Sequence, residues 1–256
     1  MGNSNEILKI ENLSLDFGRL KALDNVSFSV KRGEILGLIG PNGAGKTCIL
    51  NCINRIYNPS EGHIYFKGQE ITGLKAHDIP RLGIARVFQN IELFGGMTVL
   101  QNLMAGRHIK MKTRFWDAAL YFGKTHREEI EHRQKAEEII DFLEIQSERH
   151  KPVDTLPYGL RKRTDIGRAL CLEPEILLMD EPMAGMNVEE KEDIARFILD
   201  TQELKGTTII IVEHDMGAVM DITDRVVCMN FGKVLAEGLA EDVCTDPEVQ
   251  EAYLGV

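Results

Sequence analysis

Two kinds of hydrophobic pattern run along the chain, and they predict two kinds of β-strand. Near the N-terminus apolar and polar residues alternate over residues 13–17 and again over residues 26–30, as in strands with one face in water. Three later runs are short and continuously apolar, at residues 34–40, 175–180 and 207–212. Continuous apolar runs are typical of parallel strands that are covered on both faces. We therefore expect an antiparallel region followed by a mostly parallel central sheet.

Helical patterns fill the middle third of the chain. Thr98 and Gln101 form a capping box that opens a helix over residues 98–104. Residues 128–145 carry a helical apolar face made of Ala136, Ile139, Ile140 and Leu143. The sequence thus predicts one α/β domain over residues 1–256, with a core at 1–89 and 165–256 and an inserted α-helical subdomain at 90–164.

Composition narrows the classes of function. The formal net charge of −10 and the pI near 5.3 argue against a nucleic-acid partner, because nucleic-acid binders usually present a basic face. The five cysteines form no C-x-x-C pair, so neither a disulfide framework nor a zinc site is indicated and a reducing cytosol fits best. No apolar run approaches the roughly 20 residues of a membrane helix. Any contact with a membrane is therefore expected to go through a partner.

The stretch GPNGAGKT, from Gly40 to Thr47, is the strongest chemical pattern in the chain. It follows an apolar strand and precedes a helical pattern at Ile49, Leu50, Ile53 and Ile56, which is the context of a phosphate-binding loop. The glycines let successive backbone N–H groups point at phosphate oxygens at a helix N-terminus. Lys46 is expected to reach the β- and γ-phosphates, and the Thr47 hydroxyl to bind Mg²⁺. The alternative is a chance glycine-rich turn.

Two adjacent carboxylates, Asp180 and Glu181, end the apolar run ILLMDE. Open α/β sheets bind ligands at the carboxyl ends of their strands. We expect Asp180 to hold Mg²⁺ and Glu181 to activate a water molecule as general base. Taken alone, such a pair is more often a solvated strand end. The prediction of a site here depends on the phosphate loop in the same sheet.

Two further polar residues follow apolar strands. His214 comes after TTIIIVE and Gln89 after IARVF, so four strand ends are expected to converge at one edge of the sheet. In isolation each is an ordinary polar end of a strand. Together they predict a γ-phosphate sensor in His214 and a metal or water contact in Gln89.

The order of these motifs resembles the ATP-binding subunit of ABC transporters over essentially the whole chain. The resemblance is carried by GPNGAGKT, Gln89, LPYGLRKRTDIGRAL, ILLMDEP, AGMN and EHD. It implies a P-loop NTPase fold of the ABC ATPase type, with ATP and Mg²⁺ as ligands. The catalytic residues are then Glu181, His214 and Gln89, and the metal-binding residues are Thr47, Gln89 and Asp180. The implied nucleotide-binding residues are Phe17, Gly40, Pro41, Asn42, Gly43, Ala44, Gly45, Lys46, Thr47, Cys48, Tyr158 and Gly159.

In this family a signature loop, here residues 156–160, caps the γ-phosphate that the other subunit of a head-to-tail dimer binds. Gly159 permits close backbone approach, and a helix expected to start near Arg161 would direct its dipole at the anion. The alternative is a loop before an ordinary amphipathic helix with Ile166, Ala169 and Leu170 inward. The resemblance also assigns adenine stacking to Phe17, which could equally be a core residue of its strand.

Three residues depart from the family pattern. Pro157 stands where most members have a serine, which removes a hydroxyl and a backbone N–H. Leu160 replaces a glutamine, and Cys48 replaces the second hydroxyl of the phosphate loop. Each missing charge-assisted hydrogen bond could cost about 1.5–3 kcal/mol, so slower or more partner-dependent turnover is expected.

One branch of the family is more similar than the rest. FQNIELFGGMTVLQNL, DEPMAGMN, VEHDMGAVM and DPEVQEAYLG resemble the ATPases of branched-chain amino acid importers. The last of these pieces has Asp246 as an N-cap before Pro247, which predicts a short terminal helix. The aromatic segment at residues 114–122 lies in the subdomain that meets the membrane partner in this family, although packing within the subdomain explains it equally well.

The resemblance implies uptake of branched-chain or related amino acids, with urea or short amides as neighbouring substrates. The implied partners are membrane permease subunits, a second ATP-binding subunit and, indirectly, a periplasmic-type solute-binding protein. The expected location is peripheral, at the cytoplasmic face of the cell membrane. A soluble ABC ATPase of iron–sulfur cluster assembly is the alternative that the architecture leaves open. A P-loop kinase would not explain Gln89, the signature loop and His214 together.

Overall fold

The chain consists of two compact units in the computed structural model, which describes residues 5–111 and 124–254. One unit comprises Met1–Gln89 and Glu175–Val256, and the other comprises Asn90–Pro174. The second boundary follows Pro174, whereas the sequence patterns predicted it after residue 164. The helix that spans this stretch packs against other helices of the second unit, which accounts for the later boundary.

A six-stranded sheet is the centre of the first unit. Its strands follow the order β10-β9-β3-β8-β7-β6, and all neighbouring pairs are parallel except β10 with β9. The strands are β3 (Ile35–Ile39), β6 (Ile84–Val87), β7 (Ile176–Asp180), β8 (Thr208–Val212), β9 (Arg225–Asn230) and β10 (Lys233–Gly238). The three continuously apolar runs thus form β3, β7 and β8, in which every residue is buried.

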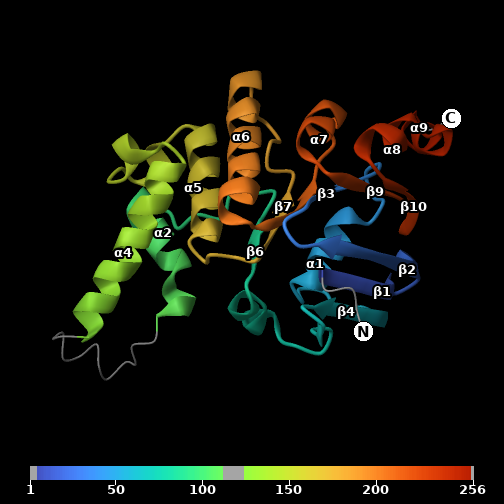
Figure 1. The fold of residues 1–256 in the computed structure, drawn as a ribbon, viewed down its shortest axis with the longest axis horizontal. Coiled ribbons are helices and arrows are strands. Elements are labelled where there is room, and N and C mark those ends of the chain that lie inside the picture. The colour runs from blue at the N-terminus through green and yellow to red at the C-terminus, as the bar shows by residue number, and fades with distance from the viewer. Residues whose placement is uncertain (1–4, 112–123, 255–256) are drawn as a thin grey trace. The chain divides into compact units, whose positions relative to one another are not determined.

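Both faces of this sheet are covered because successive side chains of a strand point to opposite sides. On β3, Leu36 and Leu38 belong to an apolar cluster with helix α1 (Lys46–Ile53) and the N-terminal strands. Ile39 belongs to a second cluster with residues of the C-terminal helices. Figure 1 shows the same layers, with α1 on one side of the sheet and α6 and α7 on the other.

The alternating N-terminal segments form a separate antiparallel sheet of order β2-β1-β4-β5. Its strands are β1 (Glu6–Phe17), β2 (Leu20–Lys31), β4 (Glu61–Phe66) and β5 (Gln69–Glu70). Leu13 on β1 pairs with Val26 on β2, and both are buried. This confirms the antiparallel region that the sequence predicted.

The remaining elements of the first unit are helical. They are the short 3₁₀ helix η1 (Ala76–Leu82) and the α-helices α6 (Val188–Lys205), α7 (Met216–Ile222), α8 (Ala240–Thr245) and α9 (Pro247–Leu254). Asn187 caps α6 and Glu190 completes the capping box, while Gly206, with φ of 66°, ends the helix. The expected cap of α9 is confirmed, since the Glu248 N–H donates to the Asp246 carboxylate at 2.8 Å.

One expectation for α1 was wrong. The pattern placed Ile56 on this helix, but α1 ends at Ile53, Arg55 adopts a left-handed φ of 59°, and Ile56 is 49% exposed. The Ile56 and Tyr57 N–H groups both donate to the Asn51 carbonyl, so a turn replaces the next helical turn.

The second unit is built from helices. They are α2 (Val99–Gly106), η2 (His108–Lys110), α4 (Lys124–Phe142), η3 (Gln146–Glu148), η4 (Val153–Thr155) and α5 (Tyr158–Leu170). The capping box of Thr98 and Gln101 is present, as predicted. The apolar face that was predicted for residues 128–145 is buried, with Ala136, Ile140 and Leu143 at 0% exposure. The aromatic segment 114–122 lies outside the described residues.

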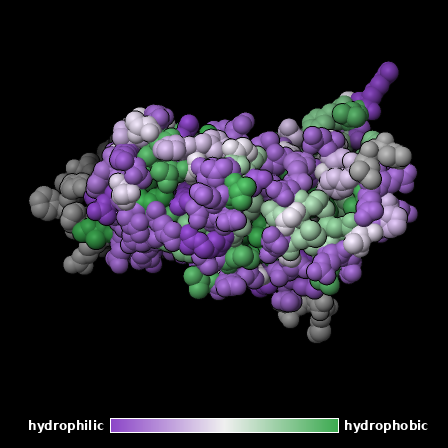
Figure 2. Space-filling view, turned by 90° about the horizontal axis from the view of Figure 1, so that it is seen from above, coloured by the Kyte–Doolittle hydropathy of each residue, from purple (hydrophilic) through white to green (hydrophobic). Residues whose placement is uncertain are grey.

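Hydrophilic residues predominate on the face in Figure 2, where hydrophobic side chains form small patches. Within residues 5–111 and 124–254, none of the helices is both long and apolar enough to span a membrane.

The central strand β3 offers a test of the core. Replacing the fully buried Leu36 with Ala should lower the free energy of unfolding by about 2–5 kcal/mol, because it removes buried methyl groups and leaves a cavity. Leu239→Ala, at a site 61% exposed, should change it by less than about 0.5 kcal/mol. Urea unfolding of both variants measures the difference, and equal midpoints would contradict this assignment of the core.

Candidate functional site

The phosphate loop connects β3 to α1, and its backbone needs glycine. Gly40, Gly43 and Gly45 have φ values of 139°, 81° and 103°, a region that side chains disfavour. At Gly40 an added Cβ would lie 2.1 Å from the Met229 carbonyl oxygen of β9, so the loop also needs the space that glycine leaves. Gly45 is the N-cap of α1 and provides no side-chain cap. The first N–H groups of α1 therefore remain available to an anion.

Lys46 is the cation of this loop. Its side chain is buried, and its Nζ donates to the Gly40 carbonyl at 2.6 Å and to the Pro41 carbonyl at 2.9 Å. Burial lowers the pKa of Lys46, while the nearby charges of Glu181 and Asp180 act in the opposite direction. The two carbonyl groups hold the ammonium group inside the curve of the loop.

Thr47 and Asp180 bring two oxygen ligands together at the start of α1. The Thr47 Oγ1 donates to the Asp180 Oδ1 at 3.3 Å, and Asp180, at the end of β7, is 2% exposed. Hydroxyl and carboxylate oxygens are the ligands that Mg²⁺ prefers. These residues fit the magnesium ion that the sequence analysis assigned to them.

Arg86 belongs to this group, and the sequence analysis missed it. Its Nη2 donates to the Asp180 Oδ2 at 2.8 Å and its Nη1 to the Asn51 Oδ1 at 2.6 Å. The Arg86 and Asp180 side chains are only 5% and 3% exposed. The ion pair thus fixes one carboxylate oxygen of Asp180 and leaves the other facing Thr47. The available signal was a single basic residue inside the apolar run IARVF.

Glu181 lies at the meeting point of three strand ends. Its Oε1 is 2.6 Å from the His214 Nε2, and its Oε2 accepts a hydrogen bond from the Gln89 Nε2 at 2.8 Å. Glu181 has a left-handed φ of 47°, and its N–H donates to the Val212 carbonyl at the end of β8. A non-glycine residue in this conformation is strained, and such strain concentrates at functional sites. The structure thus brings Gln89, Glu181 and His214 together, as the sequence analysis expected from their positions.

Comparison with known proteins identifies the family. Residues 23–184 match the ABC transporter family, and residues 233–256 match the branched-chain amino acid ATP-binding cassette transporter family. The high-affinity branched-chain amino acid transport ATP-binding protein BraF of Pseudomonas aeruginosa is 38% identical, covering 98% of this chain and 99% of its own. The chain belongs to the ABC transporter ATP-binding proteins.

Solved structures agree with this assignment. A nucleotide-free ATP-binding cassette from an ABC transporter superposes with a TM-score of 0.85 at 35% identity, covering 98% of this chain and all of the other. A dimeric ATP-binding cassette in a post-hydrolysis state, bound to ADP and phosphate, gives a TM-score of 0.77 at 25% identity over 91% of this chain and 99% of its own. This ABC protein is therefore a nucleotide-binding ATPase with the expected P-loop fold. The comparisons give no support to the iron–sulfur alternative.

The other predicted nucleotide-binding residues of the first unit lie in the loop of this ABC ATPase, in the first turn of α1 and at the end of β1. Asn42 is exposed, whereas Ala44 is buried in the core cluster. The Cys48 side chain is half-buried and packs against the same cluster, so burial raises the pKa of its thiol. Phe17 ends β1 with a ring that is 45% exposed and meets Tyr57 edge to face, with 5.1 Å between the ring centroids. Part of the Phe17 side chain is thus accessible to solvent, as stacking on a base requires.

The signature segment of the ABC ATPase lies in the second unit and differs locally from expectation. Helix α5 begins at Tyr158 and not near Arg161, with Pro157 as its N-cap. Gly159 is therefore buried in the first helical turn, while Tyr158 is 42% exposed. Proline favours a helix start because it lacks an N–H that would be unpaired there. The predicted inward face is confirmed, since Ile166, Ala169 and Leu170 are buried.

The buried ion pair of the ABC ATPase can be measured by mutation. Arg86→Met should lower the free energy of unfolding by about 3–5 kcal/mol, because it leaves the Asp180 carboxylate buried and unpaired. The double variant Arg86→Met/Asp180→Asn should cost less than the sum of the single variants. Arg81→Met, in an exposed pair with Asp78 at 3.5 Å, should cost less than about 1 kcal/mol. Additive effects of the two buried substitutions in a denaturation cycle would contradict the coupling.

Proposed function

We propose that this chain is the ATP-hydrolysing subunit of an importer that takes up branched-chain or related amino acids through a membrane permease. The match of residues 233–256 and the name of the BraF relative support the choice of substrate. The observation that carries the hydrolytic mechanism is the pair of hydrogen bonds that orient the Glu181 carboxylate at 2.6 and 2.8 Å.

In the proposed mechanism the protein orients water and phosphate with residues at one sheet edge. Glu181 accepts a proton from the attacking water as general base, and Gln89 keeps its carboxylate oriented. His214 contacts the γ-phosphate when nucleotide is bound, through the nitrogen that now lies against Glu181. Lys46 and the N–H groups of the loop neutralise and orient the β- and γ-phosphates.

Thr47, Asp180 and Gln89 are the proposed magnesium ligands. A bound magnesium ion would shield phosphate charge and favour in-line attack. The amide of Gln89 carries a carbonyl oxygen as well as the NH₂ group that donates to Glu181. One side chain can therefore bind the metal ion through its oxygen and orient Glu181 through its NH₂ group. Arg86 holds Asp180 in place for this task, and Phe17 stacks on the adenine.

The active form in this proposal is a head-to-tail dimer of ATP-binding subunits. Tyr158 and Gly159 at the start of α5 serve the nucleotide of the second subunit, as a helix N-terminus suits an anion. The dimeric cassette with ADP and phosphate among the structural relatives supports this arrangement. Closure and reopening of the dimer then move the permease.

The partners follow from the transport role. We propose permease subunits in the membrane, a second ATP-binding subunit, and a solute-binding protein that acts indirectly on the outer side. The chain then works as a peripheral protein at the cytoplasmic face of the cell membrane. The ATP hydrolysis that its residues catalyse provides the energy of transport, and the permease chooses the substrate.

Replacing Glu181 with Gln tests both the mechanism and the transport role. ATP hydrolysis should fall by about 10²- to 10⁴-fold, because the amide cannot accept the proton, while nucleotide binding persists. With MgATP the variant should accumulate as a dimer, which light scattering measures. In cells that lack the chain, the parent should restore uptake of labelled leucine and the variant should not. A variant that remains monomeric beside its permease, or a parent that restores only urea uptake, would contradict the proposal.

Pro157→Ser tests the departure from the family signature. The serine restores an N–H and a hydroxyl at the start of α5, so the rate of ATP hydrolysis should rise by about tenfold. Pro152→Ser is a matched control, because Pro152 precedes η4 with a similar backbone conformation. The control should hydrolyse ATP at the parent rate. An unchanged rate in Pro157→Ser would show that the missing groups do not limit turnover.

A further inference from the structure

The C-terminal helix α9 packs beneath the start of the phosphate loop. Val249, which is 1% exposed, joins an apolar cluster with Ile39, the last residue of β3. Tyr253, one turn further along α9, packs against the same cluster. The next residue after Ile39 is Gly40, with which the loop begins, so α9 lies against the point where strand becomes loop.

A hydrogen bond joins the two elements. The Gly40 N–H donates to the Tyr253 hydroxyl oxygen, and the nitrogen–oxygen distance is 2.6 Å. The carbonyl of the same glycine accepts from the Lys46 Nζ, also at 2.6 Å. Gly40 is thus tied to α9 through its N–H and to the loop cation through its carbonyl. This N–H belongs to the base of the loop, and its bond to Tyr253 fixes the peptide from which the rest of the loop extends.

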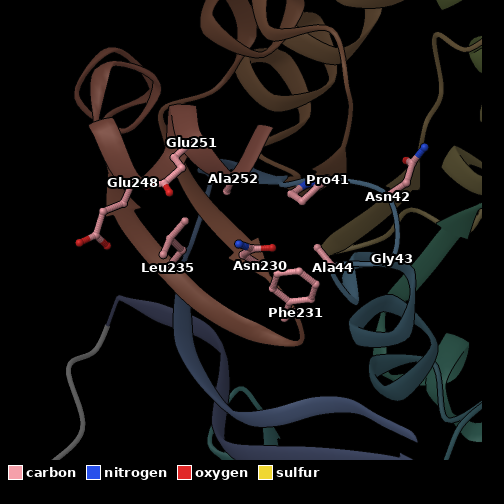
Figure 3. Close-up of a pocket in the computed structure, with 10 residues that line it drawn as sticks. All are labelled: Pro41, Asn42, Gly43, Ala44, Asn230, Phe231, Leu235, Glu248, Glu251 and Ala252. Atoms are coloured by element: carbon pink, nitrogen blue, oxygen red, sulfur yellow. The ribbon is translucent and has the colours of Figure 1, made fainter. Parts of the chain in front are cut away.

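A pocket of about 790 Å³ lies beyond this contact, between the loop and α9. Figure 3 shows Pro41 and Asn42 on one side of it, Glu251 of α9 on the other side, and between them Asn230 at the end of β9 and Phe231 in the turn that follows. Open space, and not packed side chains, therefore faces the outer side of the loop here. Beside this open space, hydrogen bonds hold the loop at its two ends, from the Gly40 N–H to Tyr253 and from the Gly232 N–H to the Ala44 carbonyl, so the bond at its base has a large share in fixing its first residues.

We propose that Tyr253 is a positioning residue for the phosphate loop: its hydroxyl holds Gly40 in the conformation that receives the nucleotide phosphates. Docking of α9 and binding of nucleotide are then thermodynamically coupled, so each favours the other. The inference rests on the proposed function only in requiring that the loop binds a nucleotide triphosphate.

The tyrosine is suited to this role over a wide pH range. Burial raises the pKa of Tyr253 to about 12, so its hydroxyl keeps the proton at neutral and mildly alkaline pH. A neutral hydroxyl accepts the Gly40 N–H without placing a negative charge beneath an anion-binding loop. The effect of removing it should therefore be the same at pH 7 and pH 9.

The test compares two tyrosine-to-phenylalanine variants of the full chain. Tyr253→Phe keeps the ring and removes the hydroxyl, which leaves the Gly40 N–H without its partner. The Kd for the non-hydrolysable analogue AMP-PNP with Mg²⁺ should rise about tenfold, and kcat for ATP should change less than twofold. Tyr65→Phe is the matched control, because Tyr65 is a half-buried tyrosine on β4, a strand that contributes no residue to the site. Its Kd should equal that of the parent.

Hydrogen exchange provides a readout that does not depend on activity. Without nucleotide, peptides covering residues 39–45 should exchange faster in Tyr253→Phe than in the parent. In the parent, AMP-PNP should slow exchange in α9, and this slowing should be weaker in the variant. Val249→Ala, which loosens α9 without removing the hydroxyl, should also raise the Kd.

The outcomes separate the two proposals. If the parent does not bind AMP-PNP, the proposed function fails. If the parent and Tyr65→Phe bind it and Tyr253→Phe binds equally well with unchanged exchange in the loop, the positioning role of Tyr253 alone is overturned. An unchanged Kd in Val249→Ala would likewise overturn the coupling between α9 and the loop, whatever the stability of the other variants.

Discussion

Backbone pairing among β3, β8 and β7 is the constraint on which the site depends. Leu38 of β3 and Asp180 of β7 both pair with Val212 of β8, so the ends of the three strands lie at the same height. A slip of one residue would turn each side chain to the opposite face of the sheet. Because every residue of these strands is buried, such a slip would place side chains of a different size and shape against the close-packed clusters on both faces. Packing in the apolar core therefore fixes the register of the strands, and the register fixes the positions of the site residues at their ends.

The second requirement is that each charged side chain buried in the site has a fixed polar or charged partner. Asp180 is buried against Arg86, and Lys46 is buried against two carbonyl oxygens of its own loop. Removing either partner of a buried pair costs more than the pair itself contributes to stability. In the proposed mechanism, each charge that meets phosphate or metal is thus already held by a fixed partner. Binding can then exchange partners with little rearrangement, which is the condition for electrostatic catalysis by preorganised groups.

The C-terminal segment provides the phosphate loop with a further fixed partner. Residues 233–256 match a family description narrower than that of the ATPase core, and they include Tyr253 and the whole of α9. The apolar cluster that holds α9 includes the residue before Gly40. A helix at the end of the chain thus stabilises the first turn of the nucleotide site through one cluster and one hydrogen bond.

Local patterns in the sequence were sufficient for the elements and for most of the site. The continuous apolar runs predicted β3, β7 and β8, and the capping residues predicted the start of α2. The glycine spacing of the loop and the polar residues at strand ends predicted which groups would converge, because parallel strands end at one edge. The start of α5 and the end of α1 were placed wrongly, since helix ends depend on turns whose hydrogen bonds no periodic pattern encodes.

The tertiary structure alone decided which side chains support the site. Arg86 meets a carboxylate 94 positions away, and Tyr253 meets a glycine 213 positions away. In the sequence each stands beside apolar neighbours, and nothing there names the distant group that it meets. The sequence by itself thus determined the strands, the loop and the reactive groups, because these follow from local periodicity and spacing. Their fixed partners came only from the folded chain, since a hydrogen bond between distant residues depends on packing that brings the two atoms within 3 Å.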